Sequence, residues 1–369
     1  MTSLFRHDLK VVSSNFDEKA ATTIKNIEVN YRGVLQRTLA RRICRNIVYA
    51  AKKDDKTSFS YGRYSDAPER DGVPCKYFAV VANLSEEDLE AEVGTKVEPD
   101  SVDVSVVLDD TMVKGVEPWA WHGVRPINEK AKPGSTLLVV SKRTPEELLK
   151  FLGKKPYPYR LAILPGESIF SGLWVFKNDG TDLRVLGAVA RVDPSLVSFA
   201  SLTELVTRRE GAKNVEALKE GYNSVVLRDV KSSEGINWPY AAVVLPKWSE
   251  FPEGIMVNGM KRGGRSENFK RFTTRTMRPV IRFDNCIKCS RCWYACQDEC
   301  FDPTSDGFYD VSYEYCVGCG RCAEVCPVKN TIVMVDELHF ENNNSPNKSY
   351  KADPAAYIKW TEEKQSGSS

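Results

Sequence analysis

The sequence contains 286-CIKCSRCWYAC-296 and 316-CVGCGRCAEVCP-327, two stretches with the same spacing, C-x2-C-x2-C-x3-C. Nine of the eleven cysteines lie between Cys286 and Cys326. Such clustering in one segment of a long chain indicates metal ligands rather than a disulfide framework. We therefore expect a compact metal-binding segment near the C-terminal end of this sequence.

This spacing is the one that bacterial ferredoxin segments use for two 4Fe-4S clusters, with three cysteines of one run and the fourth of the other on each cluster. The first cluster is predicted to take Cys286, Cys289, Cys292 and Cys326. The second is predicted to take Cys316, Cys319, Cys322 and Cys296. Two-residue gaps let a tight loop wrap thiolates around a cubane while backbone amides point at the sulfides. The chemistry that follows is electron transfer, and we predict no catalytic residue in this chain.

The two cysteine runs also form an internal repeat, since Phe283 aligns with Tyr313 and Arg291 aligns with Arg321 at the same offset as the cysteines. Such a repeat predicts a duplicated strand-loop-helix unit with crossed fourth ligands. Each cluster would then depend on both halves of the segment.

Zinc is the alternative metal, because paired C-x2-C spacings also build tetrahedral sites of four cysteines. Two runs of four, with Pro327 directly after the last cysteine, favour iron-sulfur instead. At Cys300, the ninth cysteine of the segment, we expect a small buried thiol, with a role as an alternative ligand as the other possibility. Cys44 and Cys75 have no cysteine nearby in the sequence and are expected in the core.

The bulk composition places no strong charge on the chain. It has 52 basic and 50 acidic side chains among 369 residues, so the net charge argues neither for nucleic acid nor for an anionic membrane, and we expect neither as a partner. The longest apolar runs, such as 241-AAVVL-245, are far shorter than the roughly 20 residues of a membrane-spanning helix. The first residues show no apolar signal-peptide region. We expect a soluble, cytoplasmic protein.

Residues 1–230 show the pattern of an α/β domain with a mostly parallel sheet. Strands are predicted at 24–31, 78–82, 104–108, 137–140 and 161–164, and helices at 34–53, 144–151, 184–192, 201–209 and 213–227. Leu39, Ile43 and Ile47 recur every four residues in the first of these helices. Thr144 with Glu147 predicts a capping box at the start of the second.

Residues 231–279 predict a long, mostly irregular connector rich in Gly and Pro. Its second half is basic and favours contact with an acidic partner surface. Residues 280–338 form the predicted α+β ferredoxin domain with two 4Fe-4S clusters, which is acidic, with ten Asp or Glu and four Lys or Arg in residues 284–337. Residues 339–369 are polar and predict a C-terminal arm or a disordered tail.

A family resemblance runs through the chain. The segments 277-MRPVIRFDNCIKCSRCWYACQDE-299 and 308-FYDVSYEYCVGCGRCAEVCPVKNTIVMVDE-337 resemble the delta, or ferredoxin, subunit of 2-oxoacid:ferredoxin oxidoreductases, a family that includes pyruvate synthases. Upstream segments resemble the gamma subunit of the same family: 60-SYGRYSDAPERDGVPCKYFAVV-81, 102-VDVSVVLDDTMV-113, 184-RVLGAVARVDPSLVSFASLTELV-206 and 215-VEALKEGYNSVV-226. The chain therefore looks like a fusion of gamma and delta subunits.

The resemblance implies an oxidoreductase of several subunits, active in anaerobic metabolism. In this family alpha and beta subunits bind thiamine diphosphate with Mg and a further 4Fe-4S cluster, decarboxylate a 2-oxoacid such as pyruvate, and usually transfer the acyl group to coenzyme A. This chain would carry the released electrons through its two clusters to an external ferredoxin. An iron-sulfur subunit of an unrelated dehydrogenase or hydrogenase is the alternative.

One departure from the family is large. Its gamma subunits usually open with a strand, a glycine-rich loop of the form GRGGQG and a helix, whereas this chain has 28-EVNYRGVLQRTLARR-42. Only Arg32-Gly33 of the loop remains, and the bulky residues after it would block the approach of a phosphate to backbone amides. Either a coenzyme contact is lost, as in a coenzyme A-independent oxalate oxidoreductase, or the loop was structural. Arg70, beside Glu69, is expected to contact substrate or coenzyme, or to form a loop salt bridge.

Overall fold

The computed structural model describes residues 23–63, 72–94, 98–116, 123–167, 180–241 and 270–366. The predicted pair Glu69 and Arg70 lies outside these residues, and so do residues 242–269 of the predicted connector. Within the described parts, none of the helices combines the length and the apolar character that crossing a bilayer demands.

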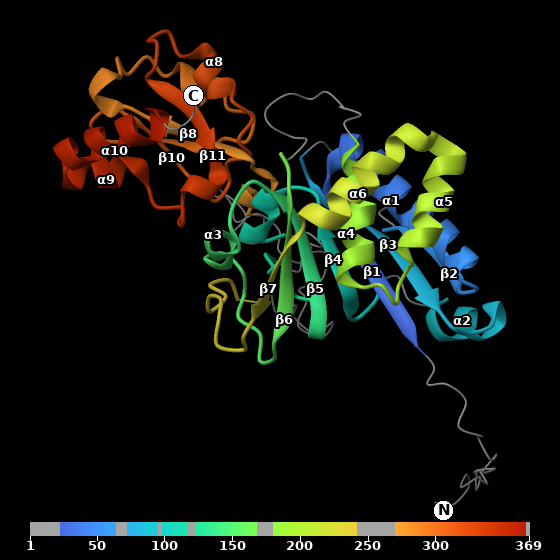
Figure 1. Cartoon of the computed structure of the whole chain (residues 1–369). Helices are drawn as coiled ribbons and strands as arrows, with labels where there is room; N and C mark the ends of the chain where they lie inside the picture. The colour runs from blue at the N-terminus through green and yellow to red at the C-terminus, as the bar shows by residue number, and fades with distance from the viewer. Residues whose placement is uncertain are drawn as a thin grey trace, which may run out of the picture.

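The first part of the chain is built on a seven-stranded sheet with the order β2-β3-β1-β4-β5-β6-β7 (Figure 1). Its strands are β1 Ile24–Arg32, β2 Thr57–Gly62, β3 Pro74–Ala82, β4 Val102–Val107, β5 Ala131–Ser141, β6 Tyr159–Pro165 and β7 Val226–Val230. The four central strands β1, β4, β5 and β6 are parallel, as predicted. The sheet is mixed, however, because β2, β3 and β7 pair antiparallel at its two sides.

Helices cover one face of this sheet. They are α1 Gly33–Lys53, α4 Thr181–Val192, α5 Phe199–Glu210 and α6 Val215–Ser224, with the shorter α2 Glu86–Val93 and α3 Pro145–Leu149 elsewhere. Ile27 and Val29 of β1 pack with Ile43 and Ile47 of α1 in the largest apolar core, so the four-residue periodicity in the sequence marks the buried face of the helix. The predicted capping box at Thr144 and Glu147 is present at the start of α3.

The C-terminal part has the short elements of a ferredoxin fold. Its strands are β8 Met277–Ile281, β9 Phe301–Pro303, β10 Tyr309–Val311 and β11 Ile332–Asp336, and its helices are α7 Arg291–Tyr294, α8 Arg321–Val325, α9 Pro346–Ala352 and α10 Pro354–Ser366. β8 pairs with β11 and β9 with β10, each antiparallel. The fold class predicted from the sequence, an α/β domain followed by a ferredoxin-type segment, is confirmed.

The expectation of an extended or disordered tail after residue 340 was wrong for the described residues. Ser345 accepts a hydrogen bond from the amide of Lys348 and starts α9, and α10 follows directly. Tyr357 of α10 is buried and donates from its hydroxyl to the carbonyl of Ile281, at 2.9 Å. Trp360 lies against Phe340, with ring centroids 5.8 Å apart. The segment is mainly polar, so its composition predicted disorder, but a few aromatic side chains such as Tyr357 and Trp360 pack these helices against the ferredoxin fold.

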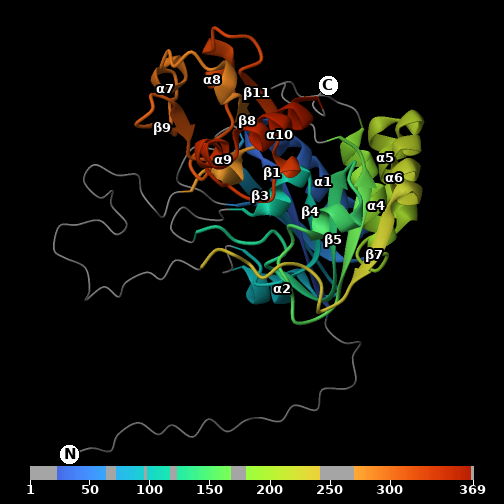
Figure 2. The same cartoon turned by 90° about the vertical axis from the view of Figure 1, so that its left-hand side faces the viewer.

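The two parts meet at the carboxyl ends of the parallel strands (Figures 1 and 2). Arg32, the last residue of β1, donates to the carbonyl of Thr273 at 2.8 Å. Lys114, in the short 3-10 helix Asp110–Lys114 after β4, pairs with Glu337. Arg143, after β5, pairs with Asp336 at 3.1 Å. In open α/β sheets this edge commonly binds ligands, whereas here the C-terminal part lies against it.

Candidate metal centres

The two cysteine loops have the same backbone geometry. Lys288 and Ser290 of the first loop have positive φ angles of 58° and 61°, and Gly318 and Gly320, thirty residues later, have 72° and 77°. Each pair of left-handed residues turns the chain back on itself between cysteines and delivers it into the short helix α7 or α8. The repeat predicted from the sequence therefore extends to the backbone conformation.

The eight predicted ligands line two separate cavities. Those of the first cavity include Cys286, Cys289, Cys292 and Cys326. Those of the second include Cys296, Cys316, Cys319 and Cys322. The structure thus brings together three cysteines of one run and the fourth of the other in each case, which is the donor set of a pair of 4Fe-4S clusters with crossed ligands. In the part of the chain that the structure describes, no three His, Cys, Asp or Glu side chains gather closely enough for a single metal ion.

Cys300 also lines the second cavity and is 1% exposed. Its amide donates a hydrogen bond to the Sγ of Cys296 at 3.2 Å. A hydrogen bond from the Cys300 thiol, with a smaller contribution from the Cys300 amide, lowers the pKa of Cys296 to about 6. The Cys300 thiol also lowers the pKa of Cys316. Hydrogen bonds to a sulfur stabilise its thiolate form, and thiolate is the form that binds metal. Cys300 is the small buried thiol that we expected. In addition, it stabilises the thiolate forms of two predicted ligands, Cys296 and Cys316.

Cys44 and Cys75 belong to the α/β part of the chain and not to the two cavities. Cys44 is fully buried in the main core of the α/β part, where burial raises the pKa of its thiol. Cys75, in β3, is half-buried against the same core. Both were expected as core residues, and neither lines a cavity with the predicted ligands.

Comparison with known proteins gives a consistent family for both parts of the chain. Residues 279–334 match the model of a 4Fe-4S dicluster domain. Pyruvate synthase subunit PorD of Thermotoga maritima is 35% identical over 96 residues, which cover 26% of this chain and 93% of that protein. This chain belongs to the 2-oxoacid oxidoreductase family.

The upstream part resembles a different subunit of that family. The common gamma subunit of the pyruvate and ketoisovalerate oxidoreductases of Thermococcus litoralis is 28% identical over 188 residues, 50% of this chain and 92% of that protein. A crystal structure of pyruvate oxidoreductase subunit PORC from Thermotoga maritima aligns with 55% of this chain at 18% identity, with a TM-score of 0.39. The chain is a fused gamma-delta subunit of an oxidoreductase, with a 4Fe-4S dicluster domain in its delta part.

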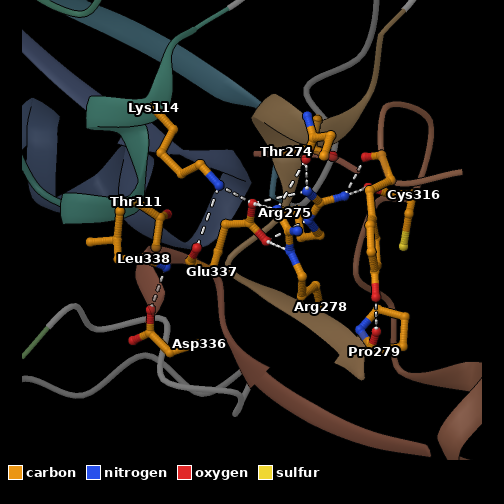
Figure 3. Close-up of polar contacts among 12 residues, drawn as sticks. Thr111, Lys114, Thr274, Arg275, Arg278, Pro279, Cys316, Asp336, Glu337 and Leu338 are labelled. Carbon is orange, nitrogen blue, oxygen red and sulfur yellow. Dashed lines mark hydrogen bonds and ion pairs between the residues drawn. The ribbon is translucent and has the colours of Figure 1, made fainter. Parts of the chain in front are cut away.

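A buried cluster of charges joins the gamma and delta parts of this 2-oxoacid oxidoreductase subunit (Figure 3). Glu337, 1% exposed, accepts from Arg275 at 2.6 and 2.9 Å and from Arg278 at 2.9 and 2.6 Å, and it pairs with Lys114 of the gamma part. Burial would raise the pKa of Glu337, but the charges of Arg275 and Arg278 outweigh it and hold that pKa well below its usual value. We call Glu337, Arg275, Arg278 and Lys114 the charge cluster.

This cluster was not predicted from the sequence. Arg275 and Arg278 counted as part of a basic connector facing an acidic partner, but they point into the chain's own interior. Lys270, in the same connector, likewise pairs with Glu314 of the delta part. The sequence did show an excess of basic residues directly before an acidic segment. That excess indicates ion pairs between the two segments, but not which acid pairs with which basic residue.

The segment that replaces the family's glycine-rich loop is closed by its own side chains. Gln36, 1% exposed, accepts a hydrogen bond from the amide of Arg32 at 2.7 Å. The Arg32 guanidinium is fully buried and donates to the carbonyls of Gly72 and Thr273. It also lies 3.5 Å from Asp109. The single arginine left from the loop therefore binds protein groups rather than facing solvent.

Proposed function

We propose that this chain is the electron-transfer subunit of a thiamine diphosphate-dependent 2-oxoacid:ferredoxin oxidoreductase. Two 4Fe-4S clusters would be held crosswise by Cys286, Cys289, Cys292 and Cys326 and by Cys316, Cys319, Cys322 and Cys296. The observation that carries the proposal is the gathering of these two sets of four cysteines around two separate cavities. Clusters of this kind accept and release single electrons, which is the chemistry that they would supply here.

Residues around the first site provide a hydrogen bond to a ligand sulfur and limit the access of water. The Lys288 amide points at the Sγ of Cys286, 3.4 Å away, as backbone amides do around reduced clusters. Trp293 stacks on Tyr309, with ring centroids 5.8 Å apart, and Tyr309 lines the first cavity. These rings limit the access of water, and solvent exposure is one of the factors that set a cluster's reduction potential.

The partners would be alpha and beta subunits that hold thiamine diphosphate, Mg and a further 4Fe-4S cluster, with external ferredoxin as the acceptor. The support for them is that the relatives are named as subunits of pyruvate synthase, of ketoisovalerate oxidoreductase and of phenylglyoxylate dehydrogenase. All three of these names refer to the oxidation of a 2-oxoacid. We propose the same substrate class for the complex that contains this chain, with pyruvate as the first acid to test.

The test is to purify this chain together with the subunits that copurify with it, without oxygen, and to measure iron, sulfide and the 2-oxoacid-dependent reduction of a viologen dye. We expect about eight iron atoms per copy of this chain beyond those of its partners. Cys289→Ser should lose about half of that iron, whereas Cys75→Ser, a control in β3, should lose none. Zinc in place of iron, or no dye reduction with any 2-oxoacid including oxalate, would overturn the proposal.

A second candidate is the same electron-transfer role in a complex that needs no coenzyme A, as in oxalate oxidoreductase. The closed segment at Arg32 and Gln36 favours it, because a coenzyme phosphate at a helix N-terminus needs free backbone amides and open space. The position of the delta part against the carboxyl ends of β1, β4 and β5 also occupies the edge at which such ligands bind.

The two candidates differ in one measurement. If no coenzyme A is used, dye reduction by the purified complex should proceed at the same rate with and without coenzyme A, and no acyl thioester should form. A strict requirement for coenzyme A would exclude the second candidate and leave the first intact.

A further inference from the structure

The buried charge cluster contains three cationic side chains and one carboxylate, so it carries a net positive charge. The side chains of Arg275, Arg278 and Lys114 are 0%, 2% and 9% exposed, and all three contact the single carboxylate of Glu337. Three other acids of this region contact other cations: Asp109 pairs with Arg32, and Asp110 and Asp336 both lie near Arg143. Burial lowers the pKa of Lys114 to about 8, so it is still mostly protonated at pH 7.

An excess of buried charge is costly unless another charge balances it. The second cysteine cavity provides the place for that charge. A cubane with four thiolate ligands is an anion and becomes more negative when it is reduced. Arg275 lies directly behind the loop that lines this cavity, because its guanidinium donates to the backbone carbonyl of Cys316 at 3.0 Å and to that of Tyr313 at 2.5 Å.

The loop that carries Cys316 is also packed directly on Arg275. A side chain at Gly318 would place its Cβ 2.6 Å from the Cγ of Arg275 and 2.1 Å from the carbonyl oxygen of Met277. Glycine therefore lets the loop approach the arginine as closely as a backbone can. The guanidinium and the loop are fixed relative to one another, so the charge has a defined position beside the second site.

The first site has no counterpart of this arginine among the described residues. Arg291 lines the first cavity and Arg321, its equivalent in the repeat, lines the second, and both side chains are exposed. These two charges are matched between the sites and screened by water. Arg275 is the additional, buried cation of the second site.

We propose that Arg275 is a positioning residue for the second cluster, which seats the 316–322 loop and raises the reduction potential of that cluster relative to the first. Glu337 holds Arg275 in place and moderates its charge, and Lys114 ties this arrangement to the gamma part. The proposal rests on the proposed function, since it requires a cluster in each cavity. A fixed cation favours the more negative, reduced state, so the second cluster is the easier of the two to reduce.

The experiment is an EPR-monitored redox titration of the full complex with Arg275→Gln, and with Arg278→Gln as the matched control. Both arginines are buried on the same carboxylate, but Arg278 donates to the carbonyl of Asn342 rather than to a cysteine. Arg275→Gln should make one cluster about tenfold less reduced at a fixed poise, a shift of about 59 mV to lower potential. Arg278→Gln should shift it clearly less, and Arg275→Lys should restore much of the wild-type value.

A change of opposite sign comes from Glu337→Gln, which removes the negative charge beside Arg275 and should move the same cluster to higher potential. Damage to packing alone would not reverse the sign between the two variants. The inference is overturned if Arg275→Gln and Arg278→Gln shift the potential equally, if neither shifts it, or if Glu337→Gln lowers it. If Arg275→Gln does not retain its clusters, the Arg275→Lys and Glu337→Gln titrations decide. Two clusters and dye reduction in the wild type would still support the proposed function in each of these cases.

Discussion

The two halves of the delta part, each built around one cysteine run, have the same loop geometry but different neighbours in the fold. Both loops use left-handed residues at the same two positions, but the first loop has Lys288 and Ser290 where the second has Gly318 and Gly320. At Gly318 of the second loop a Cβ would collide with Arg275 and Met277, whereas the equivalent position of the first loop carries the side chain of Lys288. The difference shows that ligand spacing fixes the shape of a loop, while its contacts with the rest of the chain decide which residues it can use.

Exposure separates the two halves as well. Cys316 and Cys322 are buried, at 9% and 7% exposure, while none of the cysteines of the first run is buried. The first loop also presents exposed apolar side chains, with Ile287 63% and Tyr294 79% exposed. The second half is thus turned toward the charge cluster and the gamma part, and the first half is turned toward solvent.

The largest expected effect tests whether the ligands cross between the halves. Cys326→Ser should remove the first cluster although residue 326 lies in the second run, and Cys296→Ser should remove the second cluster. Each loss should take about half of the iron, because an incomplete set of thiolates no longer holds a cubane. Iron analysis and EPR spectra of the complex measure both.

Two variants within the loops provide the reference spectra. Cys289→Ser belongs to the first run and Cys319→Ser to the second under any assignment. With crossed ligands, the spectrum of Cys326→Ser matches that of Cys289→Ser, and the spectrum of Cys296→Ser matches that of Cys319→Ser. The opposite matching would mean that each run binds its own cluster.

Much of this comparison could be predicted from the sequence, because it depends on spacing. The cysteine intervals indicated which residues gather, and the thirty-residue repeat indicated two similar loops. The apolar periodicity of α1 and the capping box at Thr144 were equally local signals, and the structure has both. Such features are encoded within a few residues of one another, so they do not depend on the rest of the fold.

The features that could not be predicted depend on distant partners. Arg275 and Glu337 are 62 positions apart, and nothing in the spacing of charges indicates which acid a given arginine meets. The antiparallel pairing of β7 with β6 depends on where the chain returns after α4, α5 and α6. The docking of α10 depends on a few aromatic side chains in a mainly polar segment, such as Tyr357, whose hydroxyl donates to the backbone carbonyl of Ile281.

The next effect in size concerns backbone strain at the second loop. Gly318→Ala should destabilise the protein by roughly 2–4 kcal/mol, because the left-handed backbone and the contacts with Met277 and Arg275 both disfavour a Cβ. Lys288→Gly, at the equivalent position of the first loop, should change stability by less than about 1 kcal/mol, since it relieves strain and adds chain entropy. Chemical unfolding of the two variants measures both values. Equal destabilisation would mean that the contacts of the second loop do not matter.

A smaller effect is expected from Cys300, which has no partner cysteine at the equivalent position of the second half. Cys300→Ala should retain both clusters and full iron, because four other cysteines complete the second site. It should cost about 1–2 kcal/mol of stability through the lost thiol and the small cavity left behind. Loss of half of the iron, with Cys75→Ala unaffected, would instead make Cys300 a ligand.

The smallest effect tests the outward-facing half. If the first loop contacts the external ferredoxin, Tyr294→Ala should leave iron content, stability and cluster potentials unchanged, because a side chain that is 79% exposed contributes little to packing. Electron transfer to ferredoxin should slow several-fold, while reduction of a small viologen dye keeps its rate. Leu227→Ala is the matched control, since Leu227 is also an exposed apolar residue, 40% exposed in the edge strand β7 of the gamma part, and lines neither cavity. A loss of ferredoxin reduction in Leu227→Ala but not in Tyr294→Ala would place the exit for electrons elsewhere, and the exposure of the first half would then reflect a covering partner subunit.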